Sequence, residues 1–262
     1  MATLLFEIGT EELPSWYVAQ GRRALVELAR ERLAAARLEH GALTGWATPR
    51  RLTVRVDDLA EQRERRIERR RGPSARVAFD DDGAPTKAAV GFARGQGVDP
   101  SALVVEETER GAYVFAEVAT GGEPAAELLP ELLAGLVRDL PAPRKMRWGE
   151  VEVPFVRPVA WLLARLDRLV LPVEVAGVRA GSVTRGHRFE APDEIELGAI
   201  DDYLEVLRAA HVLADPDERR RATVDAIAAA AAEHGLEPAW DEELLDEVVD
   251  LVERPTAIVG RF

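Results

Sequence analysis

The stretch "TLLFEIG" at residues 3–9 is short, apolar and closed by a glycine, a pattern typical of a β-strand. "TEELP" follows it directly. From residue 15 to about residue 39, apolar residues including Trp16 recur near helical spacing; Pro14 suits the first turn of a helix and Gly41 its end. A strand that leads at once into a helix predicts the start of an α+β fold.

Further strand patterns lie outward from this start. In "RLTVRV" (residues 51–56), Leu52, Val54 and Val56 alternate with polar residues, which is the two-residue period of a half-buried strand. With "TGWATP" before it, this stretch predicts a hairpin. Similar pairs are predicted at "LVVEET" with "AYVFAEVA" and at "AWLLARL" with "RLVLPVEVAGV". Together they predict a mixed α/β body domain with antiparallel strand pairs over residues 1–189.

Two more helices are predicted within this body. "TKAAVGFARGQG" (residues 86–97) has Thr86 in the position of an N-cap and a glycine-rich end, so it predicts a short helix. "PAAELLPELLAGLVRDL" (residues 124–140) predicts an amphipathic helix, which Pro130 would kink or split.

The pattern changes after residue 190 and becomes helical and acidic. Three helix candidates follow one another: "IDDYLEVLRAA", "DPDERRRATVDAIAAAAAEHG" and "DEELLDEVVDLVE". Asp215 and Asp241 stand where N-caps belong. The closing residues "RPTAIVGRF" predict a strand that begins and then stops. We therefore expect a helical segment over residues 190–262 that leads into a further C-terminal region of a longer chain.

The composition is that of a globular protein, because 47% of the 262 residues are hydrophobic and 31% are charged. The absence of cysteine excludes disulfide bonds and thiolate metal sites. Glu7 interrupts the first apolar run too early for a secretory signal, and no apolar run is long enough to span a bilayer. We expect a cytoplasmic protein without membrane association.

The formal net charge of -13 conceals an uneven distribution. Residues 41–79 contain ten arginines and five acidic residues, and residues 144–189 contain nine basic and four acidic residues. The chain from residue 190 onward contains six basic and twenty acidic residues. Local fields decide whether a polyanion docks. The two basic segments are therefore either candidates for binding a polyanion or ordinary surface charge.

Several enzyme motifs are absent from the sequence. It has no G-x-x-x-x-G-K-[ST] phosphate loop and no G-x-S-x-G nucleophile elbow. The four histidines are scattered, with no H-x-x-x-H pair, so no metal site is predicted.

Three arginine-rich elements remain as candidates for anion binding: "ATPRRL" (residues 47–52), "RKMRWG" (residues 144–149) and "TRGHRF" (residues 184–189). Guanidinium groups bind phosphate oxygens in pairs, an aromatic neighbour such as Trp148 can stack on a base, and glycine lets the backbone at Gly186 approach a ligand closely. The predicted anion-facing residues are Arg50, Arg51, Arg144, Lys145, Arg147, Arg185, His187 and Arg188.

Other interpretations of these charged residues stay open. The adjacent carboxylates of Glu11 and Glu12 serve acid–base chemistry when one is desolvated, or they occupy the first turn of a helix, where the helix dipole favours negative charge. The arginines either face an anion or form ion pairs with the acidic C-terminal helices or with internal carboxylates. Pairs of the last kind would join Arg157, Arg185 and Arg188 to Glu7, Glu11 and Glu12.

A series of stretches, in order along the chain, resembles the family of bacterial glycyl-tRNA synthetase β subunits. They are "FEIGTEELP" (6–14), "TPRRL" (48–52), "RGPS" (71–74), "AFDDDGAPTKAAVGFARGQG" (78–97), "KMRWG" (145–149), "FVRPVAWLL" (155–163), "RGHRF" (185–189) and "LVERPTAIVG" (251–260). They span essentially the whole chain, and their collinear order is far more specific than any single stretch.

The resemblance implies the N-terminal part of a β subunit, in an enzyme that joins glycine to its tRNA using ATP and assembles as α2β2. It places ATP and Mg²⁺ at the α subunit, so neither a catalytic residue nor a cofactor is expected in this chain. The implied partners are the α subunit and tRNA(Gly), with no DNA and no membrane. The family also suggests a B3/B4-like arrangement, as in phenylalanyl-tRNA synthetase.

Three roles are compatible with the residues and the resemblance together. The cations bind tRNA through its phosphates, which would position the RNA rather than read its bases. Alternatively, the region is a purely structural assembly module. A third possibility is an editing-type aminoacyl-tRNA hydrolase, in which the "TEE" carboxylates and His187 activate water.

Overall fold

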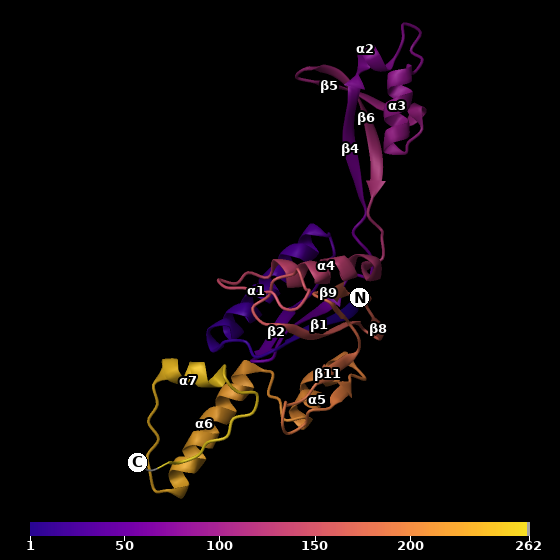
Figure 1. Ribbon diagram of the computed structural model, residues 1–262. Coiled ribbons are helices and arrows are strands. Elements are labelled where there is room, and N and C mark those ends of the chain that lie inside the picture. The colour runs from indigo at the N-terminus through magenta and orange to yellow at the C-terminus, as the bar shows by residue number, and fades with distance from the viewer. Residues whose placement is uncertain (261–262) are drawn as a thin grey trace. The chain divides into compact units, whose positions relative to one another are not determined.

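The computed structural model describes residues 1–260, in which helices and antiparallel sheets occur together (Figure 1). This confirms the predicted α+β class. The chain divides by its contacts into two compact units. The body unit consists of Met1–Glu61 together with the chain from Pro124 onward, and the inserted unit is Gln62–Glu123.

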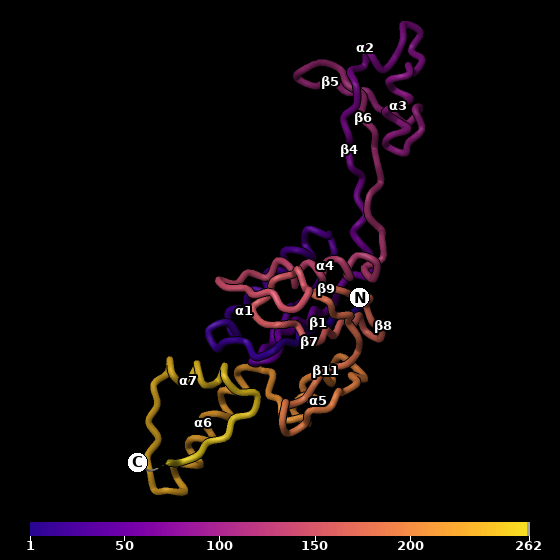
Figure 2. Tube along the Cα trace, in the orientation of Figure 1, coloured from indigo at the N-terminus to yellow at the C-terminus, as the bar shows by residue number. Residues whose placement is uncertain are grey.

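The body unit is built on a five-stranded antiparallel sheet with the strand order β2-β3-β1-β7-β8. Its central strand, β1, pairs with β3 on one side and with β7, from much later in the chain, on the other; Figure 2 labels β1 and β7 next to each other. The predicted hairpin at "RLTVRV" is confirmed; of the strand predicted to pair with "AWLLARL", only Leu169–Val170 does so. The strands are β1 (Ala2–Thr10), β2 (Leu43–Thr48), β3 (Arg51–Leu59), β7 (Val159–Leu166) and β8 (Leu169–Val170).

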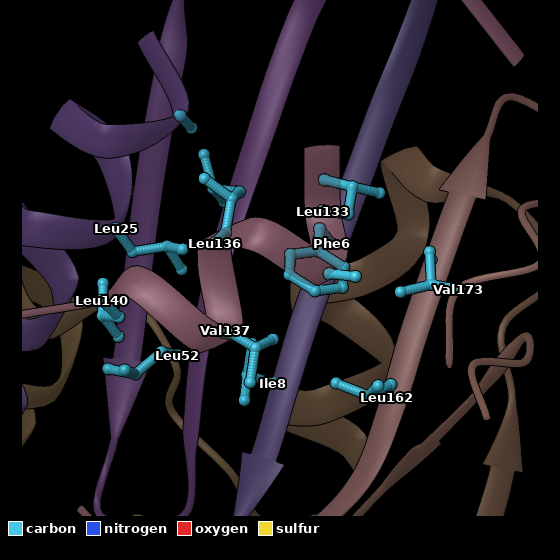
Figure 3. Packing of buried hydrophobic residues seen from close by; sticks show 14 of the residues in the cluster. Phe6, Ile8, Leu25, Leu52, Leu133, Leu136, Val137, Leu140, Leu162 and Val173 are labelled. Carbon is cyan, nitrogen blue, oxygen red and sulfur yellow. The ribbon is translucent and has the colours of Figure 1, made fainter. Parts of the chain in front are cut away.

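Both faces of β1 are buried, which explains why residues 3–9 form a nearly continuous apolar run. Leu4, Phe6 and Ile8 alternate along the strand and belong to the main hydrophobic core. Figure 3 shows Phe6 and Ile8 among the leucines and valines of this core. Leu5 belongs to a second cluster on the other face of the sheet. The central strand therefore holds two layers together.

The main core is closed by two helices, α1 (Ser15–Ala35) and α4 (Ala125–Asp139). Side chains from both helices, among them Leu25 and Leu133, belong to the same core as Phe6 (Figure 3). α4 is one continuous helix and is not split at Pro130. Proline removes a single helical hydrogen bond, and we attribute the continuity to the apolar side of α4, which packs against the sheet on both sides of that position.

The chain after residue 190 covers the other face of the sheet. Leu5 and Leu163 of the sheet pack there with Tyr203 and Leu207. The helical segments of this part are η2 (Ile200–Asp202), α5 (Tyr203–Ala209), α6 (Pro216–Glu233) and α7 (Glu242–Val249). Four short strands lie before or among them: β9 (Glu174–Val175) pairs with β10 (Val178–Arg179), and β11 (Val183–Arg185) pairs with β12 (Glu194–Glu196).

The predicted caps of the last two helices are confirmed. The Asp215 carboxylate accepts hydrogen bonds from the N–H groups of Asp217 and Glu218 at the start of α6. The Asp241 carboxylate accepts one from the N–H of Leu244 at the start of α7. No helix among residues 1–260 is both long and apolar enough to cross a membrane.

The two observed units differ from the division into residues 1–189 and 190–262 that the sequence indicated. Residues 190–260 belong to the body unit, because their apolar side chains bury one face of its sheet. The strand predicted at the end of the chain is wrong for residues 254–260, which form no strand. The remainder of that prediction, residues 261–262, lies outside the described part.

The inserted unit has a three-stranded antiparallel sheet of its own, with the order β4-β6-β5. Thr86 caps a helix as predicted, since its hydroxyl accepts from the N–H of Ala88, and Gly97 ends that helix in the left-handed conformation. The arginine-rich β4 was not predicted as a strand. The elements are β4 (Arg66–Ser74), α2 (Ala75–Ala78), α3 (Lys87–Gln96), η1 (Pro100–Ala102), β5 (Val104–Thr108) and β6 (Gly111–Thr120).

A methyl group at Gly9 tests the packing of β1 against β7. A Cβ atom there would overlap the ring of Trp161. We expect Gly9→Ala to lower the free energy of unfolding by about 1–3 kcal/mol, as overpacking does, measured by urea denaturation. Gly198→Ala is the matched control, since nothing lies within 4 Å of its added Cβ. Equal stability of the two variants would contradict the packing described.

Candidate functional site

Three segments that are distant in sequence meet beside the end of β1. The N–H of Thr10 donates to the carbonyl of Arg50 (2.8 Å), which ties "TPRRL" to β1. A guanidinium nitrogen of Arg51 donates to the carbonyl of Arg185 (2.8 Å), and this contact brings in "RGHRF". The chain after α7 joins through Glu253, whose carboxylate contacts residues of the first segment. The fold therefore brings together two of the three predicted arginine-rich elements.

A buried carboxylate, Glu7, lies at the centre of this junction. It is fully buried on β1 and accepts hydrogen bonds from the Thr184 hydroxyl (2.8 and 3.0 Å), the Trp161 indole N–H and the Tyr203 hydroxyl. Arg51 lies 3.6 Å from the same carboxylate. Burial, with the nearby Glu7 carboxylate, raises the pKa of Tyr203 well above its ordinary value, so its hydroxyl stays a proton donor.

Arg51 is likewise fully buried and faces the interior. Its guanidinium donates to Thr184 (3.3 Å) and to a carboxylate oxygen of Glu253 (3.2 Å), which also accepts from the Thr48 hydroxyl (2.6 Å). Burial alone lowers the pKa of Arg51, but the carboxylates of Glu253 and Glu7 outweigh it and raise the pKa. The prediction that Arg51 faces an external anion is corrected by this burial.

Arg185 and Arg188 keep part of their surface exposed. Arg188 binds both carboxylates of the "TEE" stretch, Glu12 at 2.9 Å and Glu11, and the hydrogen bond to Glu11 is the main reason why the pKa of Arg188 is raised. Arg185 pairs with Glu194 at 3.0 Å. Ion pairs were one of the predicted alternatives, and the structure has them, although the partners of Arg185 and Glu7 differ from those expected.

Of the predicted pairs, only those of Arg188 with Glu11 and Glu12 are found. The Arg157 guanidinium donates to the carbonyl of Val156 (3.0 Å) instead of to a carboxylate. Glu7 is instead bound by Arg51, because β3, which carries Arg51, lies next to β1 in the sheet.

Trp161 of β7 is a member of this site that sequence reasoning missed. The guanidinium carbons of Arg50, Arg51 and Arg185 lie 5.5, 5.5 and 5.3 Å from the centre of its ring. Cations are attracted to the face of an indole ring at such distances. The only signal in the sequence was its place within "FVRPVAWLL", and nothing local marked it as the neighbour of three arginines.

Arg50 differs from the other two because its charge has no polar partner. Six charged side chains are buried among residues 1–260, and Arg50 is the one for which no hydrogen bond or ion pair is formed by the guanidinium. Burial lowers the pKa of Arg50; Glu253 raises it, while the neighbouring charges of Arg188 and Arg51 lower it further. Arg50 borders a cavity of about 190 Å³.

The "RGHRF" turn forms one wall of this cavity. The N–H of His187 donates to the carbonyl of Ala210 (2.9 Å), and its Nδ1 accepts from the N–H groups of Phe189 (3.4 Å) and Glu190 (3.3 Å). A neutral His187 then carries its proton on Nε2. At Gly186, an added Cβ would lie 2.5 Å from the carbonyl oxygen of Ala191, so the turn needs glycine for close packing.

The third arginine-rich element lies in a different part of the body unit. Backbone hydrogen bonds between Met146 and Phe155 (2.7 and 3.1 Å) form its loop, and Trp148 packs against the main core. The Lys145 ammonium donates to the carbonyl of Arg138 (3.3 Å). No hydrogen bond or ion pair within residues 1–260 links the loop to "RGHRF". In that same range, the exposed side chains of two loop residues form no ion pair: Arg144 and Arg147.

The residues of the junction do not form a metal site of any obvious kind. No group of three or more histidine, cysteine, aspartate or glutamate residues that could hold a metal ion occurs in the described part of the chain. The carboxylates that border the cavity, Glu12 and Glu253, are bound to Arg188 and Arg51. Among the charged side chains that border the cavity, this leaves Arg50 as the one without a hydrogen bond or ion pair.

Comparison with known proteins places the chain in a family. Residues 4–262 match the family model described as "Glycyl-tRNA synthetase beta subunit". The chain belongs to this family. It is 43% identical to a glycine–tRNA ligase beta subunit of Myxococcus xanthus, over 99% of this chain and 37% of that protein. It is 45% identical to the same subunit of Anaeromyxobacter dehalogenans, over 100% of this chain and 38% of that protein. The resemblance noted from the ordered stretches is confirmed, and the chain spans a little over a third of the length of these relatives.

Two arginine variants test whether the junction is internal. Arg51→Ala leaves Glu7 and Glu253 buried without their cation, and we expect a loss of about 3–5 kcal/mol in the free energy of unfolding. Arg185→Ala removes a partly exposed ion pair with Glu194, and we expect a loss of less than about 1 kcal/mol. Urea denaturation of both variants measures these losses in the free energy of unfolding. A small loss for Arg51→Ala would mean that its network does not stabilise the fold.

Proposed function

We propose that this chain is the N-terminal region of a glycyl-tRNA synthetase β subunit and that it binds tRNA(Gly) through its phosphates. The observation that carries the proposal is Arg50, a buried guanidinium without a polar partner at a cavity. The chain has 47 acidic side chains against 34 basic ones, so carboxylates are plentiful. Among residues 1–260 no carboxylate forms an ion pair with Arg50, so its guanidinium is available to an external anion.

Exposed cations would add to this contact. Arg144 and Arg147 lie on the surface of a loop in the basic segment 144–189. Each phosphate neutralised by such a side chain releases counterions from the nucleic acid, which makes the affinity depend on salt. Contacts of this kind position an RNA without reading its bases.

In this proposal the activation of glycine takes place outside this region. ATP and Mg²⁺ would be used at the α subunit of an α2β2 enzyme in the cytoplasm, and this region would hold neither. No side chain of the cavity is assigned to the activation of glycine. An editing hydrolase is not favoured, because Arg188 binds both carboxylates that would have to activate water.

A second candidate role, assembly, is supported by a specific observation. Arg51 and Glu7 are bound inside the body unit, so part of the family's ordered stretches maintains the fold. A region built this way can present a fixed surface to the α subunit without touching RNA. Gel filtration of the subunit with its α partner tests this role, and loss of the complex in a variant that is still folded would support it.

Salt titration of tRNA(Gly) binding tests the first role. We expect the dissociation constant to rise steeply with salt, and the double variant Arg144→Gln/Arg147→Gln to lower the slope of log K against log salt by up to about 2, one unit for each lost phosphate contact. Arg179→Gln is the control, because Arg179 is already paired with Glu174 at 3.1 Å. Binding that does not depend on salt would contradict a phosphate contact.

A further inference from the structure

The cavity beside Arg50 has a composition that narrows the choice of ligand. Its polar and aromatic lining comes from Glu12, the "TPRRL" turn, the "RGHRF" turn and residues 251–254. The volume of about 190 Å³ is below the range of about 300–1,000 Å³ that is usual for pockets that enclose a small organic ligand. The cavity therefore suits one small group, such as a phosphate, at the end of a larger molecule.

Among the charged side chains that line the cavity, Arg50 is the one whose guanidinium forms no hydrogen bond or ion pair. Glu253 is bound by Thr48 and Arg51. Glu12 is paired with Arg188, and the remaining cation of the lining, Arg254, is paired with Glu190 outside it. The Arg50 guanidinium alone has no hydrogen-bond or ion-pair partner, and a buried charge is unfavourable unless it is paired. A single anionic group in the cavity would supply that partner.

His187 supplies a second donor beside this charge. Its Nδ1 already accepts from two backbone N–H groups, which leaves Nε2–H of the neutral ring as a donor. Gly186 lets the turn pack closely on Ala191 and Ala210 and so sets where the ring stands. A guanidinium and an imidazole N–H on one cavity are a donor set for phosphate oxygens.

An exposed aromatic ring stands at the same cavity. Phe189 borders it and is 81% exposed, although phenylalanine is normally among the most buried residues. Its ring centre lies 6.2 Å from that of His187. Exposed aromatic side chains beside a cationic groove are the surface on which bases of single-stranded nucleic acid stack. A carboxylate of another protein would pair with Arg50, but it would not account for the exposed ring of Phe189.

We propose that this cavity binds one unpaired nucleotide of RNA, with its phosphate against Arg50 and His187 and its base stacked on Phe189. The inference rests on the proposed binding of tRNA(Gly). It adds that this cavity is the part of the protein that binds an unstacked nucleotide. It also gives a physical reason for the "RGHRF" turn: the glycine shapes the turn, the histidine donates, and the phenylalanine stacks.

The test is tRNA(Gly) binding over a range of salt concentrations, with the full β subunit assembled with its α partner. Arg50→Gln is expected to weaken binding and to lower the salt slope by about 0.7–0.9, the loss of one phosphate contact. Phe189→Leu is expected to weaken binding roughly tenfold with an unchanged slope, because stacking does not release counterions. Phe189→Tyr keeps the ring and serves as the matched control, with binding close to that of the unmodified protein.

The outcomes separate this inference from the proposed function. If the unmodified enzyme does not bind tRNA(Gly) in a salt-dependent way, the proposed function itself fails. If it does, and neither Arg50→Gln nor Phe189→Leu changes the affinity, the inference alone is overturned. Inorganic phosphate is a second probe. If phosphate binds to the unmodified protein but not to Arg50→Gln, while both bind tRNA(Gly) equally well, the cavity is an oxyanion site for another ligand and the inference is overturned. Thermal unfolding of each variant shows whether it is folded. If Arg50→Gln does not fold, Phe189→Leu still tests the inference, because Phe189 is exposed.

Discussion

The buried ion pair between Glu7 and Arg51 is the constraint on which the rest of the body unit depends. Glu7 sits in the central strand, and burying a carboxylate there is unfavourable unless its oxygens are satisfied. They are satisfied by groups from β7, β11 and α5 together with Arg51 of β3. One side chain therefore fixes the positions of five elements, three of which belong to the second half of the sequence.

The same constraint determines where the candidate site lies. Arg51 uses Glu253 as its second partner, so the chain after α7 must come back to the end of β1. This return brings residues 251–254 against the "RGHRF" turn and closes the cavity. Arg50, one residue away, is left outside the network, and its guanidinium has no hydrogen bond or ion pair. An internally paired arginine and an arginine without a polar partner are thus neighbours in one short stretch.

Local rules predicted the elements whose signals are local. Thr86, Asp215 and Asp241 cap helices because the capping side chain and the backbone N–H groups that it accepts from are two or three residues apart. The strand β4 escaped notice because its side chains are mostly arginines, and its stability comes from backbone pairing with β6, which a single stretch does not display. The end of the chain was read as a strand, yet residues 254–260 have no strand beside them to pair with.

The sequence by itself determined the α+β class, the central apolar strand and the family, because these depend on local patterns and on the order of short stretches. It also identified the arginine-rich turns as the unusual feature. Only the tertiary structure decided which arginine is paired internally and which has no polar partner, since Arg50 and Arg51 are the same residue type in adjacent positions. That difference comes from partners more than 130 residues away, Thr184 at a separation of 133 and Glu253 at a separation of 202, which come to Arg51 alone when the sheet is assembled.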